Sequence, residues 1–276
     1  MKTTHYGSVQ QTVAETPLER HVEEIRLRGF TLMENVVPPA ALATWRERID
    51  TIYAAQEKHL GQALMSAIGE LDVCRAPLIH DPAFIDLASI PAVLELVRFF
   101  LGDWFILNLQ NAVINRPGIQ HHQSAWHRDL PYQNAITSTP LAINALFAID
   151  EFSANSGGTS VIPYSHKGAT LPSDAYIEQH QVVAAAPAGS VILFDAMLFH
   201  RAGFNSGSFV RRAVNHLYTI PIIKQQYDFP AALGERIPDD AALARLLGFT
   251  SVVPRDGLAW RLARAKKLDV KNNADK

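Results

Sequence analysis

Apolar side chains recur with helical spacing along the first hundred residues. The clearest start signal is Thr16 followed by Pro17, with Glu19 completing a capping box, and the clearest stop signal is Gly29. Between the helices the apolar runs are shorter, which favours one strand and a loop-rich stretch with short helices. The expected elements are helices at 17–28, 42–52 and 91–101, a strand at 30–37 and the loop-rich stretch at 59–90.

From Trp104 onward the apolar residues come in short runs separated by Gly, Pro and Asn. Such runs predict strands joined by turns, a pattern typical of a sandwich or barrel. After Pro221 the pattern becomes helical again, with a helix expected at 241–247 and a frayed end at 266–276. The expected strands are 105–115, 141–150, 159–162, 181–186, 190–195 and 210–220.

These elements predict a mainly β fold with α additions. We expect a double-stranded β-helix, the cupin-like jelly roll, flanked by N-terminal and C-terminal helices. Hydrophobic residues make up 48% of the chain and charged residues 19%, so a substantial core can be buried. No linker or internal repeat divides the sequence, and residues 1–276 are expected to form one domain with its core at about 104–222.

Charge and cysteine content narrow the function classes. The formal net charge is −2, which does not favour a nucleic-acid or membrane-surface partner. Cys74 is the only cysteine, so no intrachain disulfide forms and a reducing cytoplasm is expected. No apolar run reaches the ~18 residues of a membrane span. The expected partner is a small-molecule substrate, and the sequence does not define the oligomeric state.

The tripeptide from His127 to Asp129 carries the candidate chemistry. In an extended strand, residues two apart project from the same face, so this imidazole and this carboxylate point at one spot. His200, at the end of an apolar run, is the best candidate for a third ligand. Two imidazoles and one carboxylate on one side of a metal leave the opposite positions open, which suits Fe(II). We therefore expect these three residues to bind the metal and form the catalytic centre.

Other polar residues compete for these roles. Asp195 lies five residues before His200 and is expected to brace a strand end. His121 and His122 lie in a Gln-rich turn and are expected to be exposed. Two further histidines have structural interpretations, with His166 bracing a loop and His216 packed within a strand.

Three segments together resemble the phytanoyl-CoA dioxygenase family of Fe(II)/2-oxoglutarate oxygenases. The resemblance extends over roughly residues 20–222. Each segment alone is weak evidence, and the combination is fairly specific. The segments are Trp126-His127-Arg128-Asp129, residues 155–159 with 163–166, and residues 200–214.

The resemblance implies Fe(II) as the metal, 2-oxoglutarate as co-substrate and O₂ as oxidant. It also implies that Arg211, eleven residues after His200, holds the far carboxylate of 2-oxoglutarate. A guanidinium suits this role because its planar fork matches a carboxylate. Asn115 is the first candidate to assist, followed by Gln110. Some relatives have Ser where this chain has Ala202, so that support comes from another residue or is absent.

We expect an enzyme that hydroxylates an unactivated C–H bond of a small metabolite and releases succinate and CO₂. Arg128, Tyr132 and Gln133 flank the metal motif and are candidate substrate contacts, although strand neighbours can also point outward. Halogenases of the family lack the carboxylate, so Asp129 argues against that reaction. Two alternatives stay open: a metal-dependent cupin-like isomerase or hydrolase, which needs no carboxylate-binding Arg, and a non-catalytic small-molecule binding barrel.

Overall fold

The computed structural model describes residues 12–130, 133 and 135–274. Its first helix confirms the predicted capping box, because Glu19 N–H donates to Thr16 Oγ1 (3.2 Å) and Thr16 N–H donates to the Glu19 carboxylate (2.8 Å). The helix ends at Gly29, whose φ of 93° suits a residue without a side chain. The helices that precede the long strands are α1 (Pro17–Arg28), α2 (Leu42–Leu60), α3 (Gln62–Ala67), α4 (Ala83–Ala88) and α5 (Pro91–Leu101).

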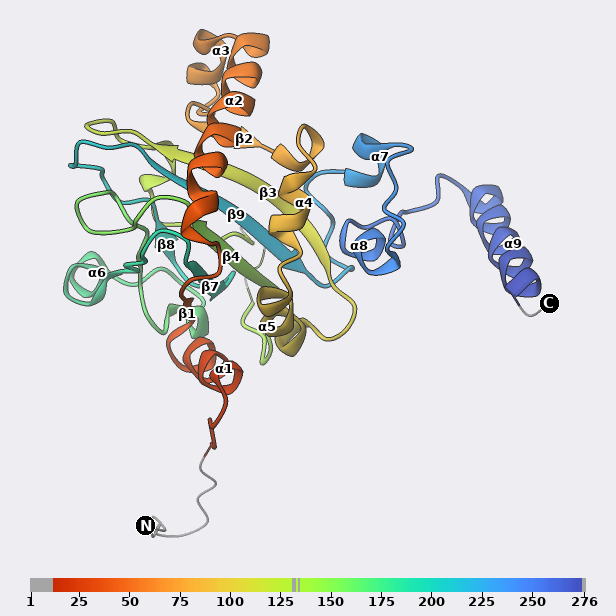
Figure 1. The fold of residues 1–276 in the computed structure, drawn as a ribbon. Helices are drawn as coiled ribbons and strands as arrows, with labels where there is room; N and C mark the ends of the chain where they lie inside the picture. Colours follow the sequence, from red (N-terminus) through yellow and green to blue (C-terminus); the bar gives the residue numbers. More distant parts are fainter. Residues whose placement is uncertain (1–11, 131–132, 134, 275–276) are drawn as a thin grey trace, which may run out of the picture.

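Two antiparallel sheets form the centre of the fold (Figure 1). The six-stranded sheet has the order β1 (Phe30–Met33), β7 (Val191–Asp195), β4 (Ala142–Ala148), β9 (Arg211–Thr219), β3 (Ile106–Asn115) and β2 (Val73–Arg75). The three-stranded sheet has the order β6 (Val182–Val183), β5 (Ser160–Val161) and β8 (His200–Arg201). With its helices, this is a mixed α/β fold with antiparallel sheets. The double-stranded β-helix expected from the sequence stays a prediction.

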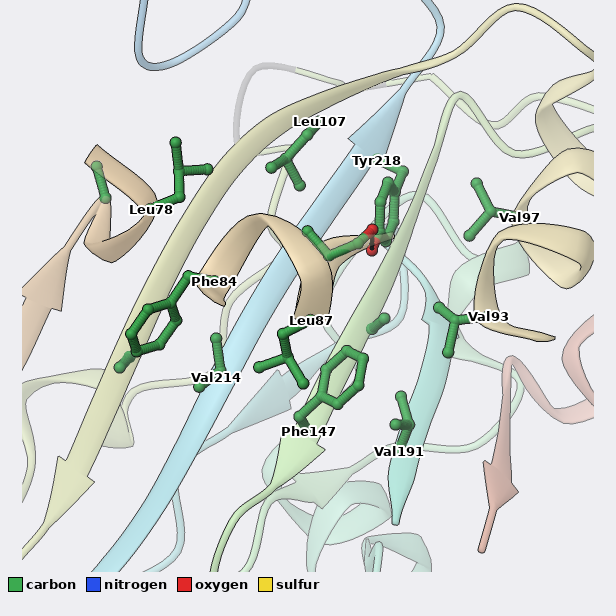
Figure 2. Close-up of a cluster of buried hydrophobic side chains, with 14 of the residues drawn as sticks. Leu78, Phe84, Leu87, Val93, Val97, Leu107, Phe147, Val191, Val214 and Tyr218 are labelled. Carbon is green, nitrogen blue, oxygen red and sulfur yellow. Dashed lines mark hydrogen bonds between the residues drawn. The ribbon is translucent and has the colours of Figure 1, made fainter. Parts of the chain in front are cut away.

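Helices α4 and α5 cover one face of the larger sheet, and their apolar side chains meet those of the strands there (Figure 2). Because side chains alternate along a strand, the other face carries a different set of residues. That second face is where β3 and β9 present polar side chains. The labelled residues of the helix-covered core are Leu78, Phe84, Leu87, Val93, Val97, Leu107, Phe147, Val191, Val214 and Tyr218.

Several elements differ from those expected. The first strand stops at Met33 because the chain turns at Asn35, which has a φ of 57°. Helix α6 (Asp174–His180) was not expected, although Ser173 caps it by accepting from Tyr176 N–H. Most of the segment 266–276, expected to be frayed, falls within α9 (Gly257–Ala274), whose sequence is rich in Ala, Leu, Arg and Lys, which favour helix. Two short helices precede it, α7 (Phe229–Leu233) and α8 (Ala241–Leu246).

Within the described ranges, no helix combines the length and the apolar character that crossing a membrane requires.

Candidate metal centre and active site

The side chains of His127, Asp129 and His200 converge, with one ligand atom of each lying within 4.8 Å of the others. His200 begins β8, and His127 pairs with it through two backbone hydrogen bonds of 3.0 and 3.1 Å. Asp129 is fixed by a bond from its backbone N–H to the Ala196 carbonyl (3.2 Å). His127 forms an isolated bridge, and Arg128 and Asp129 lie outside any strand, instead of the extended strand that the sequence suggested. Tertiary pairing therefore brings the three residues together.

Each imidazole is oriented by its second ring nitrogen. Nδ1 of His127 donates to the Ala125 carbonyl (2.9 Å), and Nδ1 of His200 donates to the Leu198 carbonyl (3.0 Å). Because a carbonyl only accepts, both Nδ1 atoms carry hydrogen, and in the neutral form of each ring Nε2 keeps a lone pair. These Nε2 atoms lie 3.8 and 3.5 Å from Asp129 Oδ1. Two nitrogens and one oxygen facing a common point are a donor set that fits Fe(II).

Burial and mutual proximity shift the pKa values of the three groups. Burial lowers the pKa of His127, and the neighbouring His200 lowers it further. Burial tends to raise the pKa of Asp129, but His200, His127 and Asn144 outweigh it and hold that pKa at about 2. Burial tends to lower the pKa of His200, but the Asp129 carboxylate raises it above the ordinary value. The carboxylate is therefore ionised at neutral pH and favours a bound cation.

The cavity that holds these three residues also contains a buried guanidinium, that of Arg211 at the start of β9. Arg211 is 2% exposed, and burial lowers its pKa to about 10. Its Nη2 donates to the Gly157 carbonyl (2.6 Å), and the group lies over the Phe152 ring at 4.5 Å. Its Nε has no partner, and among the described residues no carboxylate forms an ion pair with it. A buried cation without a counter-ion is costly, so the arrangement favours binding of an anion.

The backbone conformation and close packing at residue 157 explain why a glycine is needed there. Gly157 has a φ of 70°, and a Cβ on it would come within 2.6 Å of Asn115 Nδ2 and 2.7 Å of the Gly203 carbonyl. The Gly157 carbonyl accepts from Asn115 (3.3 Å) as well as from Arg211. Asn115 also lies opposite Arg211 in the β3–β9 ladder. The predicted assisting residue therefore lies beside Arg211, where it anchors the same carbonyl.

Gln110, the second candidate to assist, lies on the opposite face of β3. Its Nε2 donates to the Phe84 carbonyl (2.7 Å) and to His216 Nε2 (2.7 Å), and its Oε1 accepts from Leu78 N–H (3.0 Å). All three contacts belong to the helix-covered core. Its amide is therefore fully engaged away from Arg211, and the expectation that it binds a cofactor is corrected.

The three expected substrate contacts have different outcomes. Arg128 turns away from the metal ligands, because its guanidinium donates to the carbonyls of Met197 (2.8 Å) and Ser165 (3.1 Å) and lies over the Phe199 ring. It braces a loop and is not free to hold a substrate. Tyr132 lies outside the described residues. Gln133 is half-buried, and its Oε1 has no hydrogen-bond partner among the described residues. It does not line the cavity that holds His127, Asp129 and His200.

Some residues near the site were missed or placed wrongly by sequence reasoning. His121 was expected to be exposed, but it is buried, with 6% of its surface accessible, and burial lowers its pKa to about 3. Asn144 donates to Asp129 Oδ2, and nothing in the local sequence pointed to it. Asp195 does not join the metal ligands and accepts from Met197 N–H (2.9 Å), which fits the bracing role expected for it.

A second cavity of about 400 Å³ is lined in part by residues 120–122, which directly precede Gln123 of the metal-ligand cavity. It is close enough to the metal ligands for His122, which lines it, to contribute to lowering the pKa of His127. Most of the residues that line it are polar. Its lining residues with charged, imidazole or phenol side chains are Tyr53, Glu57, Asp72, Arg116, His121 and His122.

Comparisons with known proteins bear on both the family and the fold. Uncharacterized proteins of Mycobacterium bovis (Mb1539) and Mycobacterium tuberculosis (Rv1501) are each 33% identical over 250 residues, covering 86% of this chain and 89% of theirs. Human peroxisomal phytanoyl-CoA dioxygenase is 24% identical over 217 residues, covering 68% of this chain and 64% of that protein.

Among solved structures, the non-heme α-ketoglutarate-dependent epimerase SnoN from nogalamycin biosynthesis matches with a TM-score of 0.57 and 17% identity. The match covers 74% of this chain and 83% of that one, and at this identity it bears on the fold alone. The sequence model of the phytanoyl-CoA dioxygenase family matches residues 25–213, a range that includes the three metal-ligand candidates and Arg211. This chain therefore belongs to the phytanoyl-CoA dioxygenase family.

Proposed function

We propose that the protein is an Fe(II)/2-oxoglutarate-dependent dioxygenase that hydroxylates an unactivated C–H bond of a small-molecule metabolite. The products are the hydroxylated metabolite, succinate and CO₂. One observation carries the proposal: the two imidazoles and the carboxylate share a cavity with Arg211, a buried cation without a counter-ion. That combination supplies a place for the metal and a place for a dicarboxylate.

In this proposal, the residues of the chain bind the metal and orient the co-substrate. His127 Nε2, His200 Nε2 and Asp129 Oδ1 hold the metal, and Arg211 orients the far carboxylate of 2-oxoglutarate. When bound, Fe(II), 2-oxoglutarate and O₂ supply the oxidising chemistry. The protein orients the reactants and excludes water from them. Apolar neighbours support the second task, since the Phe194 ring packs edge-on against His200 at 4.8 Å.

The second cavity is the proposed site of the primary substrate. Its one arginine, Arg116, is already paired with Asp72 (2.7 Å). Glu57 accepts a hydrogen bond from Tyr53 (3.1 Å), and no cation pairs with it in the described part of the chain. His121 stays neutral because burial lowers its pKa to about 3. The wall is therefore acidic overall and rich in hydrogen-bonding groups.

This charge balance favours a compact substrate that carries hydroxyl or amino groups. A coenzyme A thioester brings several phosphate charges, and those would meet the carboxylates of Glu57 and Asp72, with only the already paired Arg116 to offset them. We therefore propose that the substrate is not an acyl-coenzyme A, although the family takes its name from an enzyme of that kind. A cavity of about 400 Å³ is also at the small end of ligand sites.

Anaerobic titration of the protein with Fe(II) and then 2-oxoglutarate tests the proposed chemistry. A weak visible charge-transfer band should appear only when both are present, and admitting air should form succinate slowly without a primary substrate. Asp129→Ala serves as the control and should form no succinate, because it removes a ligand and the charge that balances the metal. A wild-type protein that shows neither the band nor succinate would leave the isomerase, hydrolase or binding-barrel alternatives in place of the oxygenase.

A further inference from the structure

The centre of β4 contains a buried amide that core packing does not explain. Asn144 is 0% exposed, and its partners in the ladders are Phe194 on β7 and Leu217 on β9. An amide among apolar neighbours is unfavourable unless it is hydrogen-bonded. A leucine has a similar branched shape and would itself bring no polar atom into this position.

The amide of Asn144 has one partner in the structure. Its Nδ2 donates to Oδ2 of Asp129, while its own Oδ1 is buried and has no partner. The orientation of the amide is determined, because a carboxylate oxygen only accepts and the group facing it must be the NH₂. All the hydrogen bonding that this side chain achieves is therefore directed at the candidate metal ligand.

This contact distinguishes the two oxygens of Asp129. Oδ1 faces the Nε2 atoms of His127 and His200, at 3.8 and 3.5 Å, whereas Oδ2 is held by Asn144. The terminal torsion of an aspartate is soft, so without such a contact either oxygen, or both, could turn toward a metal. A carboxylate that binds through one oxygen occupies one coordination position and leaves more positions for other ligands.

We infer that Asn144 is a positioning residue that directs Oδ1 of Asp129 toward the metal and keeps Oδ2 away from it. The inference rests on the proposed function, because it concerns the metal that function requires. Groups that hydrogen-bond to ligating carboxylates orient them, and losing such a group typically weakens metal binding by about 10–100-fold.

Calorimetric titration of the full chain with Ni(II), a redox-inert ion that suits imidazole ligands, tests this inference. Asn144→Leu and Asn144→Val both remove the donor, and each should bind Ni(II) about 10–100-fold more weakly than wild type. The matched control is Asn108→Leu. Asn108 is also a buried asparagine, but its amide bonds Thr219 and the Lys224 carbonyl instead of a metal ligand. It should bind Ni(II) within about twofold of wild type.

A double-mutant cycle separates positioning from a general structural effect. If Asn144 acts through Asp129, adding Asn144→Leu to Asp129→Ala should not weaken the residual Ni(II) binding by the two histidines any further. A further loss of binding in that background, or Asn144 variants that bind like wild type, would overturn the inference while leaving the oxygenase proposal intact. Failure of both single variants to fold would assign Asn144 to the fold and also overturn it. A wild-type protein that binds neither Ni(II) nor Fe(II) would remove the proposed function itself.

Discussion

Arg211 and Arg212 are sequence neighbours with opposite surroundings. Arg211 faces the cavity of the metal ligands. Arg212 points to the helix-covered side, where it pairs with Asp50 of α2 (2.8 Å) and with Asp150 (3.1 Å). Strand alternation requires that they face apart, and the eleven-residue spacing from His200 favours Arg211 as the co-substrate residue. Of these two arginines, only Arg211 lacks a carboxylate partner among the described residues, so its charge is the one available to a ligand.

Arg211→Ala should therefore raise the 2-oxoglutarate concentration needed for half-maximal succinate formation at least tenfold. A charge-assisted hydrogen-bonded pair is worth about 1.5–3 kcal/mol, or roughly one to two decades in affinity. Arg211→Lys should recover only part of the loss, because it keeps the charge but not the fork. Arg212→Ala is the control, with a 2-oxoglutarate requirement near wild type and lower thermal stability. The reverse ranking of the two alanine variants would move the carboxylate site to Arg212.

At the level of elements, the register of β3 determines which of its polar side chains face the candidate active site. Asn115 and Gln110 are five residues apart, so a regular strand turns them to opposite faces and only one can lie beside Arg211. A register shift between Leu107 and Leu109 determines which one. Leu107 packs in the helix-covered core, and after the shift Gln110 joins that same core. Without the shift, Gln110 would have turned toward the metal ligands and Asn115 away from them.

Gln110→Leu should lower the free energy of unfolding by at least about 2 kcal/mol, because it leaves buried backbone and imidazole groups without partners. It should not change the affinity for 2-oxoglutarate. Urea denaturation and a 2-oxoglutarate titration of the same preparation measure the two effects. Adding His216→Leu should recover only part of the stability, because the Leu78 N–H and the Phe84 carbonyl stay unpaired. Weaker 2-oxoglutarate binding in a well-folded Gln110→Leu protein would contradict this assignment.

For the whole molecule, buried neutral histidines make stability depend on pH. Burial lowers the pKa of His216 to about 3, that of His121 to about 3 and that of His166 to about 4. In the unfolded chain each titrates near 6.5. Above that pH both states are neutral and these groups contribute no pH dependence. Below it the unfolded chain takes up protons that the folded protein does not, so stability falls as pH decreases from about 6.5.

Lowering the pH from 7.5 to 5 should therefore cost about 2 kcal/mol of folding free energy for a histidine as deeply buried as His216. The measurement is the urea midpoint at the two pH values. His216→Leu should show a smaller difference between the two pH values than wild type, even if it is less stable at both. An equal or larger difference in the variant would mean that His216 becomes protonated within the folded protein.

The predictions that succeeded rest on signals that are local in the sequence. The capping box at Thr16 and the stop at Gly29 involve atoms a few residues apart, and the structure shows both. The helix predicted at 91–101 has the same bounds as α5, because its apolar spacing and flanking Pro and Gly all lie within one segment. The long strands were also predicted well. The short strands β5 and β6 depend on pairing with distant segments, so their lengths were overestimated, and β2 and β8 were not predicted.

The sequence by itself determined the residue types of the candidate site, their spacing and the family, because the candidate metal ligands and the arginine proposed to bind a carboxylate leave a pattern along the chain. Tertiary structure alone decided which side of a strand each polar group faces. The register shift in β3 sends Gln110 into the core, and loop carbonyls draw Arg128 away from the metal ligands. It also brought Asn144 to Asp129 across fifteen residues of sequence. These contacts depend on which strands pair and in which register, and a single sequence does not show that pairing.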